Sequence, residues 1–221
     1  MSEKDLPTSC QFTLEEIKAL VEEAHHVGAK SASHAQGAPG VKNALLAGVD
    51  TIEHGIYLDD ELIEMMIKQG TYLVPTLAIV DAIIRGGLKA GVPEVSLNKA
   101  RSIQKVHLKS FEKAFKAGVK IGSGTDYLSD PMSPMGENAA ELELQVKAGR
   151  SPMDVIVSAT KVNAEALGLG DKLGTLAQGK LADLIVVEGD PLKDITILRN
   201  RTNILSVYKQ GTQVPRLNVP S

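Results

Sequence analysis

The sequence predicts an α/β fold, in which short parallel strands alternate with amphipathic helices and a small β element follows near the C-terminal end. Three observations support this fold class. A unit made of an amphipathic helix, a glycine and a short apolar segment occurs four times. Each apolar segment leads to a polar residue, and the alternation stops after Gly170. Helices that alternate with short apolar strands favour parallel packing, because each crossover helix covers a sheet face that the strands leave apolar.

The four units can be placed along the chain by their helix signals and apolar segments. Thr13 and Glu16 form a capping-box pattern at the start of the first helix, and a glycine follows each helix. The helices are expected at residues 13–26, 41–47, 59–68 and 96–116. The strands are expected at residues 29–33, 49–53, 71–74 and 119–122. The polar residues that follow these strands are His34, His54, Thr76 and Asp126.

The C-terminal part of the chain has a different character. Further helices are expected at residues 137–147 and 151–168, and strands at residues 181–187, 204–208 and 212–214. Ser151 and Pro152 form a helix-start pattern, and Gly211 marks the turn between the last two strands. We therefore divide the chain into a β/α domain at residues 1–170 and a C-terminal β element at residues 171–221.

The composition of the 221 residues excludes several classes of function. The net charge is −3 and aromatic residues make up 3% of the chain, so neither a basic surface nor base stacking for nucleic acid is expected. The apolar runs are strand-sized, far short of the roughly 20 residues that span a bilayer. Cys10 is the one cysteine and the first residues lack the apolar stretch of a secretory signal. A cytoplasmic location without disulfides is therefore expected, with no role for Cys10 in catalysis.

The polar residues at the strand ends suggest a metal site. In parallel β/α folds the carboxyl ends of the strands form one rim, so His34, His54 and Asp126 are expected to converge there. Imidazole and carboxylate are ordinary zinc ligands, and a zinc-bound water becomes a nucleophile near neutral pH. A single histidine near a strand end is more often a satisfied polar residue than a ligand; the repetition at equivalent positions favours ligation. His107 falls in the middle of a helix and is expected at or near the surface.

An ordered set of motifs adds a family resemblance. The motifs are His34–Gly37, Gly48–Gly55, Val74–Leu77, Gly124–Asp126, Ser158–Thr160 and Gly174–Leu184. Together they resemble the second half of the amidohydrolase superfamily, in the branch with imidazolonepropionase-like enzymes and metal-dependent Xaa-Pro dipeptidases. The resemblance implies a partial (β/α)8 barrel, about strands 5–8 with their helices, followed by a small C-terminal β-sandwich element.

The resemblance also implies roles for individual residues. His34 resembles the metal ligand after the fifth strand, His54 the one after the sixth, and Asp126 the aspartate after the eighth. Asp126 would contact the metal and act as the general base, whereas Thr76 would shape the pocket. The complete enzyme would hold one or two divalent metal ions, zinc in our interpretation, and no other cofactor. It would hydrolyse a non-aromatic C–N or amide bond in a small molecule, a dipeptide or a cyclic amide.

Two departures from the family pattern qualify these expectations. The chain contains no His-x-His pair, which the family carries on its first strand, and the match begins after the place of the bridging lysine. Met135 stands where relatives often have a histidine. Half of the barrel is therefore expected to be missing, and we expect either a homo-oligomer or a complementing N-terminal half, because unpaired strand edges favour association.

Two alternatives remain open from the residues. The same metal-hydroxide attack would serve a lactonase or a phosphotriesterase-like enzyme. The absence of the His-x-His ligands is also compatible with a truncated, non-catalytic α/β protein. Neither nucleic acid nor a membrane is expected as a partner.

Overall fold

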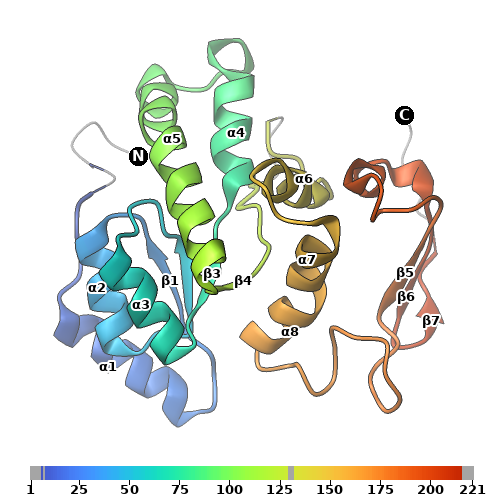
Figure 1. Ribbon diagram of the computed structural model, residues 1–221, viewed down its shortest axis with the longest axis horizontal. Coiled ribbons are helices and arrows are strands. Elements are labelled where there is room, and N and C mark those ends of the chain that lie inside the picture. The colour runs from blue at the N-terminus through green and yellow to red at the C-terminus, as the bar shows by residue number, and fades with distance from the viewer. Residues whose placement is uncertain (1–5, 7, 129–131, 216–221) are drawn as a thin grey trace.

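The computed structural model describes residues 6, 8–128 and 132–215 (Figure 1). It contains a parallel sheet with strands β1 (Ala32–Ala35), β2 (Thr51–His54), β3 (Tyr72–Val74) and β4 (Lys120–Ile121). These strands pair in the order β1-β2-β3-β4, each parallel to the next. A second, antiparallel sheet consists of β5 (Leu184–Val187), β6 (Ile204–Lys209) and β7 (Thr212–Gln213). The expected α/β class is confirmed.

Helices connect the parallel strands and continue after them. They are α1 (Leu14–His26), α2 (Ala38–Ala47), α3 (Asp60–Gln69), α4 (Leu77–Gly86), α5 (Glu94–Ala117), α6 (Ala139–Lys147), α7 (Pro152–Val157) and α8 (Asn163–Ala166). A π-helical turn at Ser158–Val162 joins α7 to α8. Short 3-10 turns lie at Leu88–Ala90, Ile195–Arg199 and Arg201–Asn203. Figure 1 shows α6–α8 between the two sheets.

Local signals in the sequence determine several helix ends. Thr13 and Glu16 form the expected capping box of α1, and the Asp59 side chain accepts a hydrogen bond from the N–H of Leu62 at the start of α3. Gly48 and Gly70 end α2 and α3 in the left-handed conformation, with φ values of 86° and 74°. The glycine that ends each of these two helices therefore stands only a few residues before the next strand.

The main core lies between one face of the parallel sheet and helices α1, α2, α3 and α5. Its strand residues include Ile52, Leu73 and Ile121, whose exposed fractions are 3% or less. On the other face, Ala32 and His34 are exposed. The sheet thus buries one face against helices, whereas the face that carries His34 is exposed at β1 and buried at Thr51 of β2.

The outer edge of β4 is held by side chains from the π-helical turn and α8. The N–H of Gly122 bonds across to β3, so the backbone groups of Ile121 and Ser123 point the other way. Ser158 donates to the Ile121 carbonyl at 2.6 Å. The Asn163 amide pairs with both the N–H and the carbonyl of Ser123, at 2.9 and 2.8 Å. These bonds fix the start of the segment that leads to Asp126.

Some details differ from the sequence-based expectations. His34 and His54 lie in the last two residues of their strands rather than after them. Helix α4 was not expected, and β5 begins at Leu184, three residues later than expected, because residues 181–183 are not part of the ladder. The expected strand around Ala29 also begins later, at Ala32. The domain division at residue 170 stays a prediction.

Candidate metal site

The ends of three neighbouring strands share an unusual backbone conformation. Among the described residues other than glycine, positive φ values occur at His54 (74°), Thr76 (52°), Asp126 (58°) and Gln210 (52°). His54 is the last residue of β2, and Thr76 and Asp126 follow β3 and β4, whereas Gln210 lies in the turn before β7. A left-handed β-branched residue such as Thr76 is a genuine outlier, and such strain persists mainly at functional sites. The conformation therefore marks this rim independently of the residue types.

The two predicted histidine ligands are in direct contact. Nδ1 of His34 and Nε2 of His54 lie 2.8 Å apart, and the two rings meet edge to face with centroids 4.4 Å apart. Nδ1 of His54 lies 2.6 Å from the hydroxyl of Thr76. His54 and Thr76 are buried, at 5% and 3% exposed, whereas His34 is exposed. The parallel register explains the meeting, because Ala35 is paired with His54 and the two strands end together.

The contacts of the two rings agree with one arrangement of the ring protons. The amide nitrogen of Gln36 lies 3.4 Å from Nε2 of His34, and an amide nitrogen can only donate. With Nε2 of His34 as the acceptor, its Nδ1–H donates to Nε2 of His54. Nδ1–H of His54 in turn donates to the Thr76 hydroxyl. Two imidazole nitrogens thus face each other with one proton between them.

Burial keeps His54 in its neutral form. It lowers the pKa of His54 to about 3, and the neighbouring His34 and His107 add smaller effects in the same direction. A neutral imidazole is the form that ligates metal ions. His54 therefore offers a lone pair, rather than a positive charge, to the rim.

Asp126 lies at the same rim but does not join the two histidines as a third grouped ligand. Its side chain is exposed, desolvation raises its pKa, and the nearby His34 partly opposes this shift. Glu53 lies within electrostatic range of Asp126, and its own pKa is raised mainly by burial. Within the described part of the chain, no three His, Cys, Asp or Glu side chains are grouped so that they could hold a metal ion. The geometry brings two of the three predicted ligands together and leaves Asp126 nearby.

The donor atoms of His34 and His54 suit a divalent cation. Two imidazoles on adjacent strand ends are ordinary zinc ligands, and a hydrogen bond from the opposite ring nitrogen, as between His54 and Thr76, is the usual support for such a ligand. His34 and His54 would hold such an ion through these ring nitrogens, and it would supply Lewis-acid chemistry at the rim. The pair therefore fits half of a metal site.

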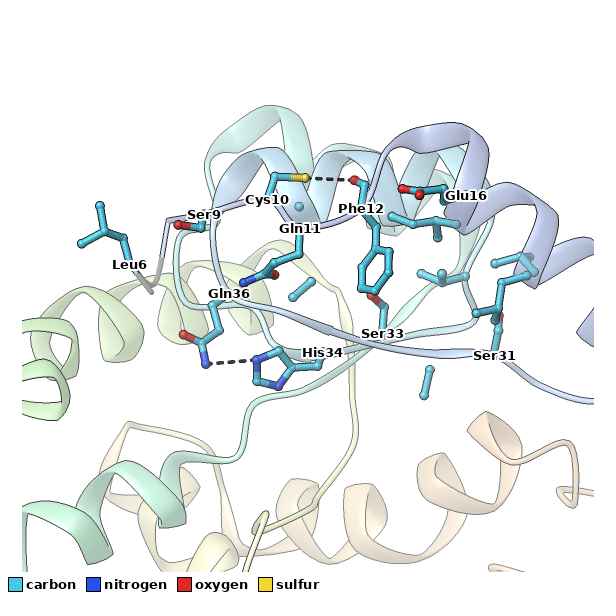
Figure 2. A pocket seen from close by; sticks show the side chains of 17 residues that line it. Leu6, Ser9, Cys10, Gln11, Phe12, Glu16, Ser31, Ser33, His34 and Gln36 are labelled. Atoms are coloured by element: carbon cyan, nitrogen blue, oxygen red, sulfur yellow. Dashed lines mark hydrogen bonds between the residues drawn. The ribbon is translucent and has the colours of Figure 1, made fainter. Parts of the chain in front are cut away.

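A cavity of about 510 Å³ opens beside His34 (Figure 2). It is lined by residues 31–36 of β1 and its flanks, by the N-terminal segment and by α1. Figure 2 shows Phe12 above Ser33, and Gln36 reaching toward the His34 ring. The cavity therefore gives access to the exposed member of the histidine pair from the free edge of the sheet.

His107 is the residue that the sequence-based reasoning placed wrongly. It is 1% exposed, and its Nε2 lies 3.1 Å from the carbonyl oxygen of His54. The signal was present in the helical spacing, since Ile103, His107, Phe111 and Ala114 share one buried face of α5. The expectation of a surface histidine is wrong because the polar ring satisfies a buried carbonyl at the strand end.

Comparisons with known proteins identify the family of the chain. The model of the amidohydrolase family matches residues 5–214. Ochratoxinase from Aspergillus niger is 34% identical over 213 residues, which are 96% of this chain and 43% of that protein. Imidazolonepropionase from Caldanaerobacter subterraneus subsp. tengcongensis is 26% identical over 209 residues, covering 87% and 44% of the two chains.

A solved structure supports the fold as well as the family. The crystal structure of a Xaa-Pro dipeptidase with bound methionine is 41% identical and superimposes with a TM-score of 0.81, covering 92% of this chain and 49% of that one. The resemblance to this branch is thereby confirmed. The chain spans about half the length of the relatives it matches. In the described residues, no helix is both long and apolar enough to cross a membrane. A match over residues 5–214, together with more than 30% identity across nearly the whole chain, shows that this protein belongs to the amidohydrolase family, whose members among these relatives are hydrolases of carbon–nitrogen bonds.

Proposed function

We propose that this chain carries the second half of the metal site of a metal-dependent amidohydrolase. The single observation that carries the proposal is the pair of facing nitrogens of His34 and His54, 2.8 Å apart at the ends of adjacent parallel strands. The left-handed backbone at His54, Thr76 and Asp126 supports it, because strain of this kind concentrates at functional sites. His34 and His54 would hold the ion, zinc being the metal that suits them, and Asp126 would be the third ligand.

The proposed reaction is hydrolysis of an amide or other non-aromatic C–N bond. When bound, a divalent metal lowers the pKa of a coordinated water toward neutrality. Asp126 takes the proton of the attacking water and later donates it to the leaving nitrogen. Its raised pKa, caused by desolvation, suits a group that must both accept and return a proton. A Xaa-Pro dipeptide is the substrate class that the dipeptidase relative favours.

The proposal includes a missing half. We infer that the parallel sheet forms strands 5–8 of a (β/α)8 barrel, and that β5–β7 belong to a small sandwich. Backbone N–H groups of β2 and the residue after it donate to the carbonyls of Ser31 and Ala35, so the backbone groups of Ala32 and His34 point to the free edge of β1. The cavity along this edge offers room for a further strand, from a complementing N-terminal half or from a second copy.

Reconstitution tests this function. The chain would be mixed with a polypeptide that covers the part of the Xaa-Pro dipeptidase relative outside the match, and zinc-dependent release of proline from Xaa-Pro dipeptides would be measured. We expect hydrolysis, and a loss of at least about 100-fold with Asp126→Asn, which keeps the shape but cannot act as a base.

Two results would count against the proposal. Equal rates for the wild type and Asp126→Asn would remove the general base from the mechanism. A folded, zinc-loaded complex without activity on dipeptides, cyclic amides, lactones or phosphotriesters would favour the second candidate, a non-catalytic protein. The observation behind that candidate is that no complete three-ligand group occurs among the described residues.

A further inference from the structure

Two buried polar side chains of α5 contact the loop that follows β2. His107 faces the carbonyl of His54, with Nε2 and the oxygen 3.1 Å apart. One turn further along, Ser110 donates to the carbonyl of Ile56 at 2.8 Å and accepts from the N–H of Leu58 at 3.2 Å. Both side chains are buried, His107 at 1% and Ser110 at 4% exposed. The loop is irregular, so its buried backbone groups depend on these partners.

His107 contacts the backbone of a strained strand end and of the residue before another. The His54 carbonyl belongs to a residue with φ of 74°, and the imidazole of His107 also makes a hydrogen-bonding contact with the backbone of Pro75, just before the left-handed Thr76. A left-handed residue other than glycine costs about 1–3 kcal/mol and persists only when its surroundings hold it. Ser110, by contrast, contacts only the loop beyond His54. One ring therefore contacts the backbone of His54 and of Pro75, the residue before Thr76.

The ring of His107 is also suited to a permanent donor role. Burial lowers its pKa to about 4, so it is neutral and carries one N–H under ordinary conditions. Nε2 is the ring nitrogen that faces the His54 carbonyl, which can only accept, so we assign the proton to Nε2. No titration is needed for this role.

We propose that His107 is a positioning residue for His54. Its Nε2–H holds the His54 carbonyl, keeps the backbone at His54 left-handed, and so directs the His54 ring between His34 and Thr76. The effect of His107 on the arrangement of the histidine pair does not depend on a metal site. Its effect on metal binding rests on the proposed function.

The test compares three variants of the whole chain. His107→Leu removes the donor and keeps an apolar side chain, His107→Gln restores an N–H donor of similar reach, and Ser110→Ala is a matched control on the same helix and loop. Two-dimensional ¹H–¹⁵N spectra of the imidazole rings report the tautomers of His54 and His107 without any metal. Titration with Co²⁺, followed by its absorption spectrum, reports the metal affinity.

We expect wild-type His107 as the Nε2–H tautomer and His54 as the Nδ1–H tautomer. His107→Leu should lose the single tautomer of His54 and weaken Co²⁺ binding about 10–100-fold, as is usual for partners that support a ligand. His107→Gln and Ser110→Ala should keep both properties. If His107→Leu does not fold, the wild-type spectrum still decides, because an Nδ1–H tautomer of His107 would overturn the proposal.

Other outcomes separate this inference from the proposed function. A His54 signal unchanged in His107→Leu, or equally disturbed in Ser110→Ala, would overturn the positioning role. Absence of Co²⁺ binding by the wild type, with the His54 tautomer lost only in His107→Leu, would count against the metal site and leave the positioning role supported.

Discussion

Replacing Thr76 by valine isolates the contribution of one hydroxyl to the histidine pair. The hydroxyl lies 2.6 Å from Nδ1 of His54, and both side chains are at least 95% buried. Valine keeps the β-branched shape, so the strain of the left-handed backbone is unchanged while the ring N–H loses its acceptor. An unsatisfied buried donor costs about 1–3 kcal/mol.

Urea unfolding followed by circular dichroism measures this cost. With a slope of about 2 kcal/mol per M, the midpoint of T76V should fall by about 0.5–1.5 M. Thr71→Val is the matched control, because Thr71 is 4% exposed and its hydroxyl donates to the Val49 carbonyl at 3.4 Å, a longer bond worth about 0.5 kcal/mol or less. Equal losses of stability in T76V and T71V would refute the reasoning that Thr76 is the acceptor for His54.

Two further predictions concern the buried scaffold. Burial raises the pKa of Glu141 from 4.5 to about 7, so the native state holds an extra proton between these values, and stability is lost as the pH rises through them. Between pH 5 and pH 8 the unfolding free energy of the wild type should therefore fall by roughly 3 kcal/mol more than that of Glu141→Gln. An equal fall in the two proteins would contradict this prediction. Gly55 and Gly48 both have positive φ, but a Cβ on Gly55 would lie 2.6 Å from Leu73 Cδ1, whereas one on Gly48 meets nothing within 4 Å. Gly55→Ala should therefore cost about 1–3 kcal/mol more than Gly48→Ala in thermal or urea unfolding, and equal costs would show that backbone strain alone matters.

Features encoded by neighbouring residues could be predicted from the sequence. The capping box at Thr13 and the left-handed glycines after α2 and α3 depend on residues a few positions away, so the alternation of helices and strands was visible. The meeting of His34 and His54 also followed, because parallel strands of similar length end at one rim. Their roles as ligands, and that of Asp126, stay predictions.

Features that depend on distant partners could not be predicted. Helix α4 has no capping side chain at Thr76; the carboxylate of Glu141 accepts the N–H of Ala78 at 2.8 Å, from 63 residues away in the chain. His107 was misjudged for the same reason, since its partner, the His54 carbonyl, lies 53 residues earlier. Nothing in the local sequence around Thr76 signals that its backbone is left-handed, and its contact with His54 was not expected.

Zinc binding by the chain tests the central claim, that His34 and His54 form half of a metal site, most directly. Equilibrium dialysis against zinc, followed by elemental analysis, should give about one ion for each wild-type chain. His34→Ala and His54→Ala should each lose it, whereas His26→Ala, an exposed histidine in the last turn of α1, should keep it. A wild-type chain that takes up no zinc, or zinc retained by both His34→Ala and His54→Ala, would contradict the account.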